Sequence, residues 1–193
     1  MIDNWNTITL PNIPILECKL GEDAIKYLWD CISYATKYPN GELGRFLYLK
    51  DDNDYFFKNH LQEQCQKYIT DYQDAISFRN TFTHDNTSKL VLRDFWVNFS
   101  RKSKITPYHD HTGVLSFAIW MDIPGTSDFV MTYTDILGKI RTMNWKTNSD
   151  INGTMIVFPA TLGHQVYPFN DSDQERISIS GNLYLDTSDI ITS

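Results

Sequence analysis

Hydrophobic residues follow two different periods along this chain, and the change comes at about residue 85. In residues 21–38 and 57–76, apolar side chains recur every three or four positions. This spacing predicts two amphipathic helices, because residues three and four apart share one helix face. The motif Pro39-Asn40-Gly41 ends the first stretch, and Asn53 or Asp54 can cap the second. Each helix therefore needs an apolar surface on which to pack.

After residue 89 the helical period gives way to short β-rich runs separated by turn residues. Strands at this spacing with short connections indicate an antiparallel sandwich or barrel. Two helices followed by strands predict the α+β class, with the helices on one side of the sheet. We expect one domain over residues 1–193, in which 1–85 is mainly helical support and 86–193 the β-barrel core. The predicted strands span residues 90–100, 114–123, 128–133, 140–146, 154–158, 164–167 and 176–185.

The last of these strands has one polar and one apolar face, because successive side chains point to opposite sides of a strand. The polar face could lie in water, or it could line the interior of a barrel. The predicted helices need an apolar sheet face, which favours the second interpretation. The polar face carries Arg176, Ser178, Ser180 and Asn182, and the apolar face carries Ile177, Ile179 and Leu183.

The charge balance limits the classes of partner. The chain has a formal net charge of −7 and a pI near 5.1, which argues against nucleic acid. Its densest basic run, residues 101–104, is typical of a solvated loop. No apolar stretch is long enough to span a membrane. Cys18, Cys31 and Cys65 lack metal-site spacing and indicate reduced thiols inside a cell. The aromatic residues of the N-terminal part (Trp5, Trp29, Phe46 and Tyr48) could form a homodimer face.

His109-Asp110-His111 is the densest group of metal-ligand side chains. In an extended segment His109 and His111 project to the same side, so both imidazoles can reach one metal ion, while Asp110 points away. A His-x-His pair alone is weak support, because many such pairs face solvent. His164 follows a tight turn much later in the chain.

Arg176 strengthens this interpretation. A hairpin around residues 170–173 would place it beside Val166 or Tyr167. A guanidinium inside a barrel needs an anion, and Ser178 would add a hydroxyl on the same face. The alternative is a structural salt bridge between Arg176 and Glu175 or a nearby aspartate.

The order and spacing of four segments resemble the Fe(II)/2-oxoglutarate-dependent oxygenases, and the small members found in bacteria and tailed phages most closely. The resemblance implies a double-stranded β-helix, a jelly-roll or cupin-like barrel, with N-terminal helices that buttress its larger sheet. It also implies a cytoplasmic location in a bacterial or phage-infected cell. The segments are residues 96–98, 107–116, 153–159 and 164–182.

The resemblance assigns roles to particular residues. His109 and His164 match the first and the distal ligand of Fe(II), and Arg176 with Ser178 matches the pair that binds the far carboxylate of 2-oxoglutarate. The acidic ligand position falls on His111, which departs from the family pattern of two histidines and one carboxylate. We expect three histidine ligands, with Asp110 as the alternative third ligand.

Further candidates surround this predicted site. Asn98 could bind 2-oxoglutarate or the substrate, whereas Tyr108, Trp120 and Asn182 could line the substrate pocket. Residues 126–152 could form a lid. The predicted function is hydroxylation of a small-molecule or peptidyl substrate with O₂. The alternatives are a non-catalytic jelly-roll binding or virion-associated module, and a three-histidine, cupin-type dioxygenase that does not use 2-oxoglutarate.

Overall fold

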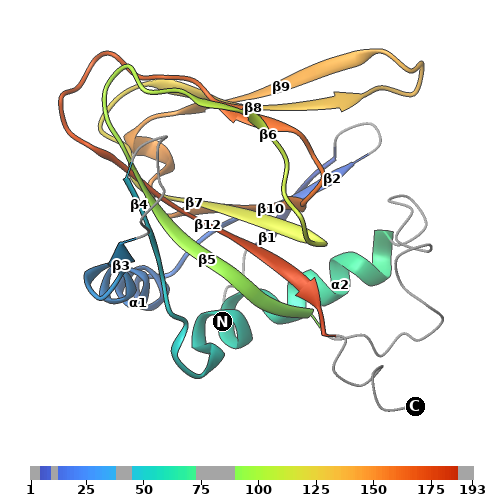
Figure 1. Ribbon diagram of the computed structural model, residues 1–193. Helices are drawn as coiled ribbons and strands as arrows, with labels where there is room; N and C mark the ends of the chain where they lie inside the picture. Colours follow the sequence, from blue (N-terminus) through green and yellow to red (C-terminus); the bar gives the residue numbers. More distant parts are fainter. Residues whose placement is uncertain (1–4, 10–12, 38–44, 73–89, 187–193) are drawn as a thin grey trace.

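The computed structural model describes residues 5–9, 13–37, 45–72 and 90–186, and two antiparallel sheets face each other in it (Figure 1). The large sheet has the strand order β1-β2-β10-β7-β12-β5-β4-β3, and the small sheet has the order β6-β11-β8-β9. The strands of the large sheet are β1 (Trp5–Thr9), β2 (Pro14–Lys19), β3 (Thr36–Lys37), β4 (Arg45–Tyr48), β5 (Leu90–Ser100), β7 (Leu115–Asp122), β10 (Thr154–Pro159) and β12 (Arg176–Leu185). Those of the small sheet are β6 (Thr106–His109), β8 (Ser127–Thr134), β9 (Ile140–Thr147) and β11 (His164–Val166).

The helices cover the outer face of the large sheet, opposite the small sheet (Figure 1). They are α1 (Glu22–Ser33) and α2 (Gln62–Tyr72), and a π-helical turn, Phe57–Leu61, leads into α2. Leu28 of α1 and Cys65 of α2 belong to one buried cluster with Ile179 and Leu183 of β12. The apolar face of β12 therefore packs under the helices, as the sequence predicts, and its polar face is left for the space between the sheets.

A second apolar cluster lies between the two sheets. Phe129 and Met131 of β8 pack there against Trp120 of β7 and Phe158 of β10. The strands β7 and β10 are buried along almost their whole length, since one face meets the first cluster and the other meets this one. These two strands therefore form a buried wall of the barrel interior.

The N-terminal part is less helical than the sequence suggests. Four strands lie among the described residues before residue 85: β1 and β2 extend one edge of the large sheet, and β3 and β4 extend the other. The boundary at residue 85 therefore does not separate helical support from the barrel. The first helix is also shorter than predicted, because α1 ends at Ser33 and residues 36–37 form β3. The second is helical from Phe57 to Tyr72. Residues 38–41 and 73–76 of these predictions lie outside the described residues. Strands this short take their pairing from distant neighbours, such as β2 from β10, and periodicity does not reveal them.

The predicted hairpin between residues 164 and 185 is wrong. β11 pairs with β6 and β8 in the small sheet, whereas β12 pairs with β5 and β7 in the large sheet. The intervening segment crosses from one sheet to the other. Arg176 nevertheless reaches Tyr167, because its Nη1 donates to the Tyr167 carbonyl oxygen at 3.3 Å.

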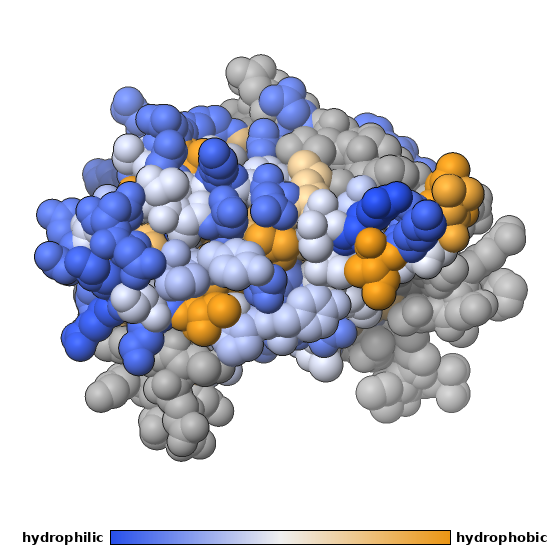
Figure 2. All heavy atoms as spheres, turned by 90° about the horizontal axis from the view of Figure 1, so that it is seen from above, coloured by the Kyte–Doolittle hydropathy of each residue, from blue (hydrophilic) through white to orange (hydrophobic). Residues whose placement is uncertain are grey.

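The outer surface of the small sheet is mainly hydrophilic. Hydrophobic residues appear on this side as separate spots and not as one continuous patch (Figure 2). The most exposed apolar side chains here belong to Ile136, Leu137 and Ile140, at the turn between β8 and β9. None of the described helices combines the length and the apolar character that crossing a bilayer requires.

Candidate functional site

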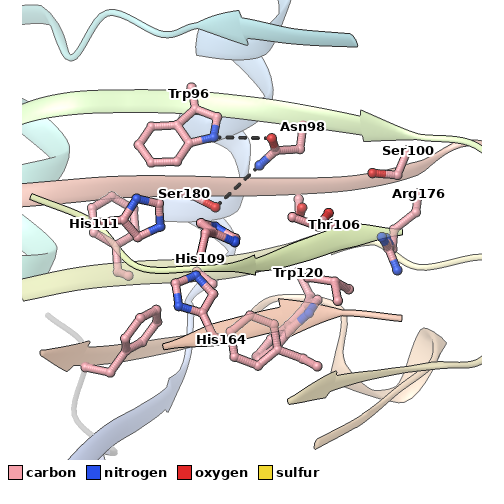
Figure 3. Close-up of a pocket in the computed structure, with 16 residues that line it drawn as sticks. Trp96, Asn98, Ser100, Thr106, His109, His111, Trp120, His164, Arg176 and Ser180 are labelled. Atoms are coloured by element: carbon pink, nitrogen blue, oxygen red, sulfur yellow. Dashed lines mark hydrogen bonds between the residues drawn. The ribbon is translucent and has the colours of Figure 1, made fainter. Parts of the chain in front are cut away.

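Three histidines meet between the sheets at one end of the barrel (Figure 3). His109 ends β6 and is paired in register with His164, which begins β11; His111 follows two residues after His109. The ring centroids of His109 and His164 lie 4.3 Å apart, and those of His111 lie 5.0 and 5.1 Å from the other two. One ring nitrogen from each residue lies within 4.8 Å of the other two, a spacing that one metal ion can bridge.

The backbone fixes the orientation of two of these rings. His109 Nδ1 donates to the Pro107 carbonyl oxygen at 2.7 Å, and His164 Nδ1 donates to the Leu162 carbonyl oxygen at 2.9 Å. A carbonyl oxygen can only accept, so the hydrogen is on Nδ1 and the lone pair is on Nε2. Metal-binding histidines are commonly held in this way by a contact from the other ring nitrogen.

Burial keeps His111 and His164 neutral. It lowers the pKa of His164 to about 3; the hydrogen bond to the Leu162 carbonyl opposes this shift, and the nearby His109 and His111 add to it. Burial is also the main reason that the pKa of His111 falls to about 4, with a smaller opposing effect from Asp110 and Asp94. A metal ligand must carry a free lone pair, so both rings are ready to bind an ion at neutral pH.

Arg176 lies inside the barrel without a carboxylate partner among the described residues. Its side chain is buried and donates from Nη1 to Ser127 Oγ at 2.9 Å and to the Tyr167 carbonyl oxygen. The salt bridge that sequence reasoning offered as an alternative is absent, because Glu175 pairs with Arg101 instead. Burial lowers the pKa of Arg176 to about 10, so the guanidinium is still charged at neutral pH. With five N–H donors and two protein acceptors, it can bind an anion.

A cavity of about 90 Å³ joins the histidines to Arg176 (Figure 3). This volume is well above the ~15 Å³ that one water needs. Ser178 and Asn98 line its wall, and Asn98 is held by Trp96 Nε1 at 3.2 Å and by Ser180 Oγ at 3.4 Å. A small molecule in this cavity can contact both the imidazoles and the guanidinium.

A wider cavity of about 360 Å³ lies next to the first. The two share a boundary formed by Trp96, Asn98, Ser100, Thr106 and His111. The wider cavity, which we call the outer chamber, is lined in addition by Phe46, Tyr48, Asp94, Phe99 and Asn182. Both cavities reach His111, so a second ligand in the outer chamber can lie beside this ring.

Part of the chain, which contains this site, matches a known protein family. Residues 94–182 match the family described as "Putative 2OG-Fe(II) oxygenase". The match runs from β5 to β12 and includes all three clustered histidines, Arg176 and Ser178. It confirms the resemblance to the 2-oxoglutarate oxygenases seen in the sequence. No curated protein sequence matches the chain.

Several solved structures share the fold at low sequence identity. An oxidoreductase of the 2OG-Fe(II) oxygenase family from Burkholderia pseudomallei is 13% identical, with a TM-score of 0.53 over 87% of this chain and 84% of its own. HygX from Streptomyces hygroscopicus, crystallised with nickel and 2-oxoglutarate, is 8% identical, with a TM-score of 0.54 over 90% and 83%. AviO1 from Streptomyces viridochromogenes is 14% identical, with a TM-score of 0.50 over 92% of both chains. The predicted α+β class and double-stranded β-helix are thus confirmed.

The usual ligand set for iron in such sites is two histidines and one carboxylate. Here a third histidine, His111, takes the place of the carboxylate. The clustered group among the described residues consists of His109, His111 and His164. Asp110, the alternative third ligand, has an exposed side chain and lies outside this group. Three neutral imidazoles leave a bound divalent ion one charge unit more positive than the usual set.

The structure separates the weaker site candidates. Trp120 lines the small cavity, Asn182 lines the outer chamber, and Asn98 lines both. Tyr108 is 60% exposed and lies over Gly163, and it is not among the residues that line either cavity.

Sequence reasoning missed Trp96, Thr106 and Asp94 as cavity residues. Asp94 and Trp96 lie four and two positions from Asn98 along β5 and therefore share its face of the strand, so a face-by-face reading of this strand could have found both.

Residues 126–152 form a hairpin in the small sheet. β8 and β9 pair over eight positions, and buried Phe129 and Met131 join the hairpin to the inner cluster. Phe129 also lines the small cavity, so the hairpin forms one of its walls. A lid function for this segment stays a prediction.

Proposed function

We propose that this protein is an Fe(II)- and 2-oxoglutarate-dependent oxygenase that hydroxylates an organic substrate. One molecule of O₂ would be divided between the two products: the hydroxylated substrate, and the succinate formed with CO₂ from 2-oxoglutarate. One observation carries the proposal. A single cavity has three imidazoles that can ligate a metal at one end, and at the other a buried guanidinium that no carboxylate of the described residues contacts.

His109, His111 and His164 would hold Fe(II). The arrangement fits the ion, because the three ring nitrogens lie within bridging distance and His111 and His164 are neutral. Imidazole suits iron, nickel, zinc and copper, so purified protein could carry another metal in place of iron. When bound, Fe(II) would supply the activation of O₂. The chain itself would set the ligand geometry and exclude bulk water.

Arg176 and Ser178 would bind the far carboxylate of 2-oxoglutarate. The guanidinium presents paired donors that match a carboxylate, and Ser127 Oγ and the Tyr167 carbonyl oxygen hold it from behind. Ser178 lines the same cavity and would add a hydroxyl donor. Asn98, fixed by Trp96 and Ser180, would donate to the cosubstrate or to the substrate.

The prime substrate would enter through the outer chamber, beside His111. A small molecule or a peptidyl side chain is of suitable size for this space, whereas the net charge of −7 argues against nucleic acid. We place the protein in the cytoplasm, which is supported by three buried cysteines that are all free thiols. A homodimer through the N-terminal aromatic residues stays a prediction.

The decisive experiment mixes anaerobic protein with Fe(II) and then with 2-oxoglutarate. We expect a visible metal-to-ligand absorption band, and succinate after air is admitted. Arg176→Met should lose both, whereas Arg101→Met, which alters an exposed arginine, should keep both. Oxygen uptake that does not need 2-oxoglutarate would instead support the cupin-type dioxygenase. If the metal-loaded protein gives neither the band nor succinate, the result would support the non-catalytic jelly-roll binding module.

A further inference from the structure

The outer chamber contains a charged group that the proposed metal and cosubstrate chemistry does not use. Asp94 of β5 is half-buried and lines this chamber together with His111. Asn182 Nδ2 donates to Asp94 Oδ2 at 3.0 Å, and the Tyr184 hydroxyl donates to the same oxygen at 2.7 Å. Both protein contacts therefore use Oδ2, and Oδ1 accepts no hydrogen bond from the described residues.

Neighbouring strands hold the carboxylate in this position. Asp94, Asn182 and Ser116 lie opposite one another on β5, β12 and β7. Ser116 Oγ donates to Asn182 Oδ1 at 2.7 Å, which leaves the amide group of Asn182 aimed at Asp94. The Tyr184 hydroxyl is fixed in turn by Thr112 Oγ1 at 3.0 Å. Side chains with satisfied partners of their own thus orient the carboxylate, as in preorganised binding sites.

No cation among the described residues pairs with Asp94. The adjacent Arg93 lies over the Tyr184 ring, 5.3 Å from its centroid, and makes no ion pair with the carboxylate. A partly desolvated carboxylate gains most from a cationic partner, and here that partner can come from a ligand.

Aromatic side chains form the walls of the same chamber. Phe46 and Tyr48 of β4 line it with their rings edge to face, 6.1 Å apart, and Trp96 of β5 contributes an indole. Aromatic faces attract cations and pack well against the aliphatic stem that carries them. Aromatic walls around one carboxylate are therefore suited to an organic cation.

The available oxygen also distinguishes between cations. A guanidinium binds a carboxylate best through both oxygens, but Oδ2 already accepts two hydrogen bonds. An ammonium group is a compact charge that can use Oδ1 alone. The geometry thus favours a protonated amine over a guanidinium.

We propose that the outer chamber binds an alkylammonium group through Asp94 Oδ1, between Trp96 and the aromatic pair Phe46 and Tyr48. The prime substrate would then be an amine whose aliphatic stem extends toward His111. The role of this amine as a substrate rests on the proposed oxygenase function, whereas the binding of its ammonium group does not.

The test measures binding of pentylammonium to the metal-free protein of residues 1–193 by calorimetry, with 1-pentanol and pentanoate as probes with the same five-carbon chain. We expect pentylammonium to bind at least tenfold more tightly than either. Asp94→Asn should remove this preference. Asp122→Asn should keep it, because it makes the same charge change at an exposed position of β7. Pentylguanidinium should bind more weakly than pentylammonium.

A second variant keeps the proposal testable if Asp94→Asn does not fold. Tyr48→Leu changes a partly exposed wall residue and should reduce the ammonium preference a few-fold while the far-ultraviolet circular dichroism stays unchanged. Equal binding of the ammonium and the alcohol to the wild-type protein overturns the proposal, as does a preference that survives in Asp94→Asn.

The two proposals fail separately. Asp94-dependent ammonium binding without any succinate formation would refute the oxygenase and leave the amine site. Succinate formation from a protein that binds pentylammonium and pentanol equally would refute the amine site and leave the oxygenase.

Discussion

Arg176 Nη1 lies 2.9 Å from Ser127 Oγ, and this hydrogen bond joins the first residue of β12 in the large sheet to the first residue of β8 in the small sheet. Thr147 Oγ1 donates to the Ser127 carbonyl oxygen at 3.1 Å. Its hydroxyl oxygen can then accept from Ser127 Oγ, 2.8 Å away. The guanidinium is therefore tied to the hairpin of β8 and β9, on the opposite wall of the barrel.

Replacing Arg176 should separate stability from cosubstrate binding. An unpaired buried charge is costly, so Arg176→Met should raise the free energy of unfolding by about 1 kcal/mol or more, or roughly 2–4 °C in melting temperature. A ligand that binds only the folded state stabilises it. Saturating 2-oxoglutarate should therefore raise the melting temperature of the metal-loaded wild type but not of Arg176→Met. A similar rise in both proteins would exclude Arg176 as the anion site.

Ser127 should act on the cosubstrate through Arg176. Ser127→Ala removes one acceptor that orients the guanidinium, and we expect about a tenfold weaker affinity for 2-oxoglutarate, near the ~1.5 kcal/mol of one charged hydrogen bond. The affinity for the metal should not change. Titration of 2-oxoglutarate into the anaerobic Fe(II) protein measures the first quantity, and Ser149→Ala, at an exposed position, is the control. An unchanged affinity would show that Arg176 does not need this contact.

His111 should accept a carboxylate replacement. His111→Asp recreates two histidines and one carboxylate, so it should retain about one metal ion per chain. His111→Ala should bind the metal at least tenfold more weakly, as measured by metal analysis after dialysis. The opposite pattern, with full metal content in His111→Ala and none in Asp110→Ala, would assign the third ligand to Asp110.

The metal-free protein should lose stability in acid. Unfolded histidine has a pKa near 6.5, whereas folded His164 and His111 have pKa values of about 3 and about 4. As the pH falls below 6.5, the unfolded chain therefore takes up protons that the folded chain does not. Each ring should lower the free energy of unfolding by about 1.4 kcal/mol per pH unit between 6.5 and its folded pKa.

Denaturant unfolding in the presence of a chelator, at pH values from 7.5 to 5, measures this dependence. Between pH 7.5 and 7, His111 and His164 should contribute almost no pH dependence to the free energy of unfolding. His111→Gln should show a shallower decline than the wild type, and equal slopes would contradict the predicted contribution.

His60 should destabilise the fold without affecting the site. It is buried against Phe56 and Tyr55, and neither ring nitrogen has a hydrogen-bond partner among the described residues. Leaving such groups unsatisfied costs about 1–3 kcal/mol. His60→Leu should therefore raise the free energy of unfolding, and more so in acid, because burial lowers the pKa of His60. Metal content should stay the same, and a destabilised variant would show that the ring has a polar partner.

Strand-level features were largely predictable from the sequence. The predicted strand 90–100 has the bounds of β5, and the predicted strand 176–185 has those of β12. The two faces of β12 were also assigned correctly, with Ile179 toward the helices and Ser178 toward the cavity. The grouping of His109, His111 and His164 followed from the family resemblance, since no local pattern connects residues so far apart.

Other features of the site could not be read from the sequence. From the sequence alone, the neighbouring Glu175 was a plausible ion-pair partner for Arg176, but in the structure Glu175 pairs with Arg101. The role of Asp94 as an oriented carboxylate was not predictable either, because no local pattern indicates that Asn182 and Tyr184 both donate to one of its oxygens.

The amino-acid sequence by itself determined the two helices, the long strands β5 and β12, and which face of β12 is polar, because these properties depend on the geometry of a few adjacent residues. Only the tertiary structure decided that β11 and β12 lie in different sheets, that Arg176 is buried with no carboxylate partner in the described part of the chain, and that Asp94 faces a chamber with aromatic walls. Those outcomes depend on which distant strands bury their apolar faces together, and that choice sets which charges meet and which do not.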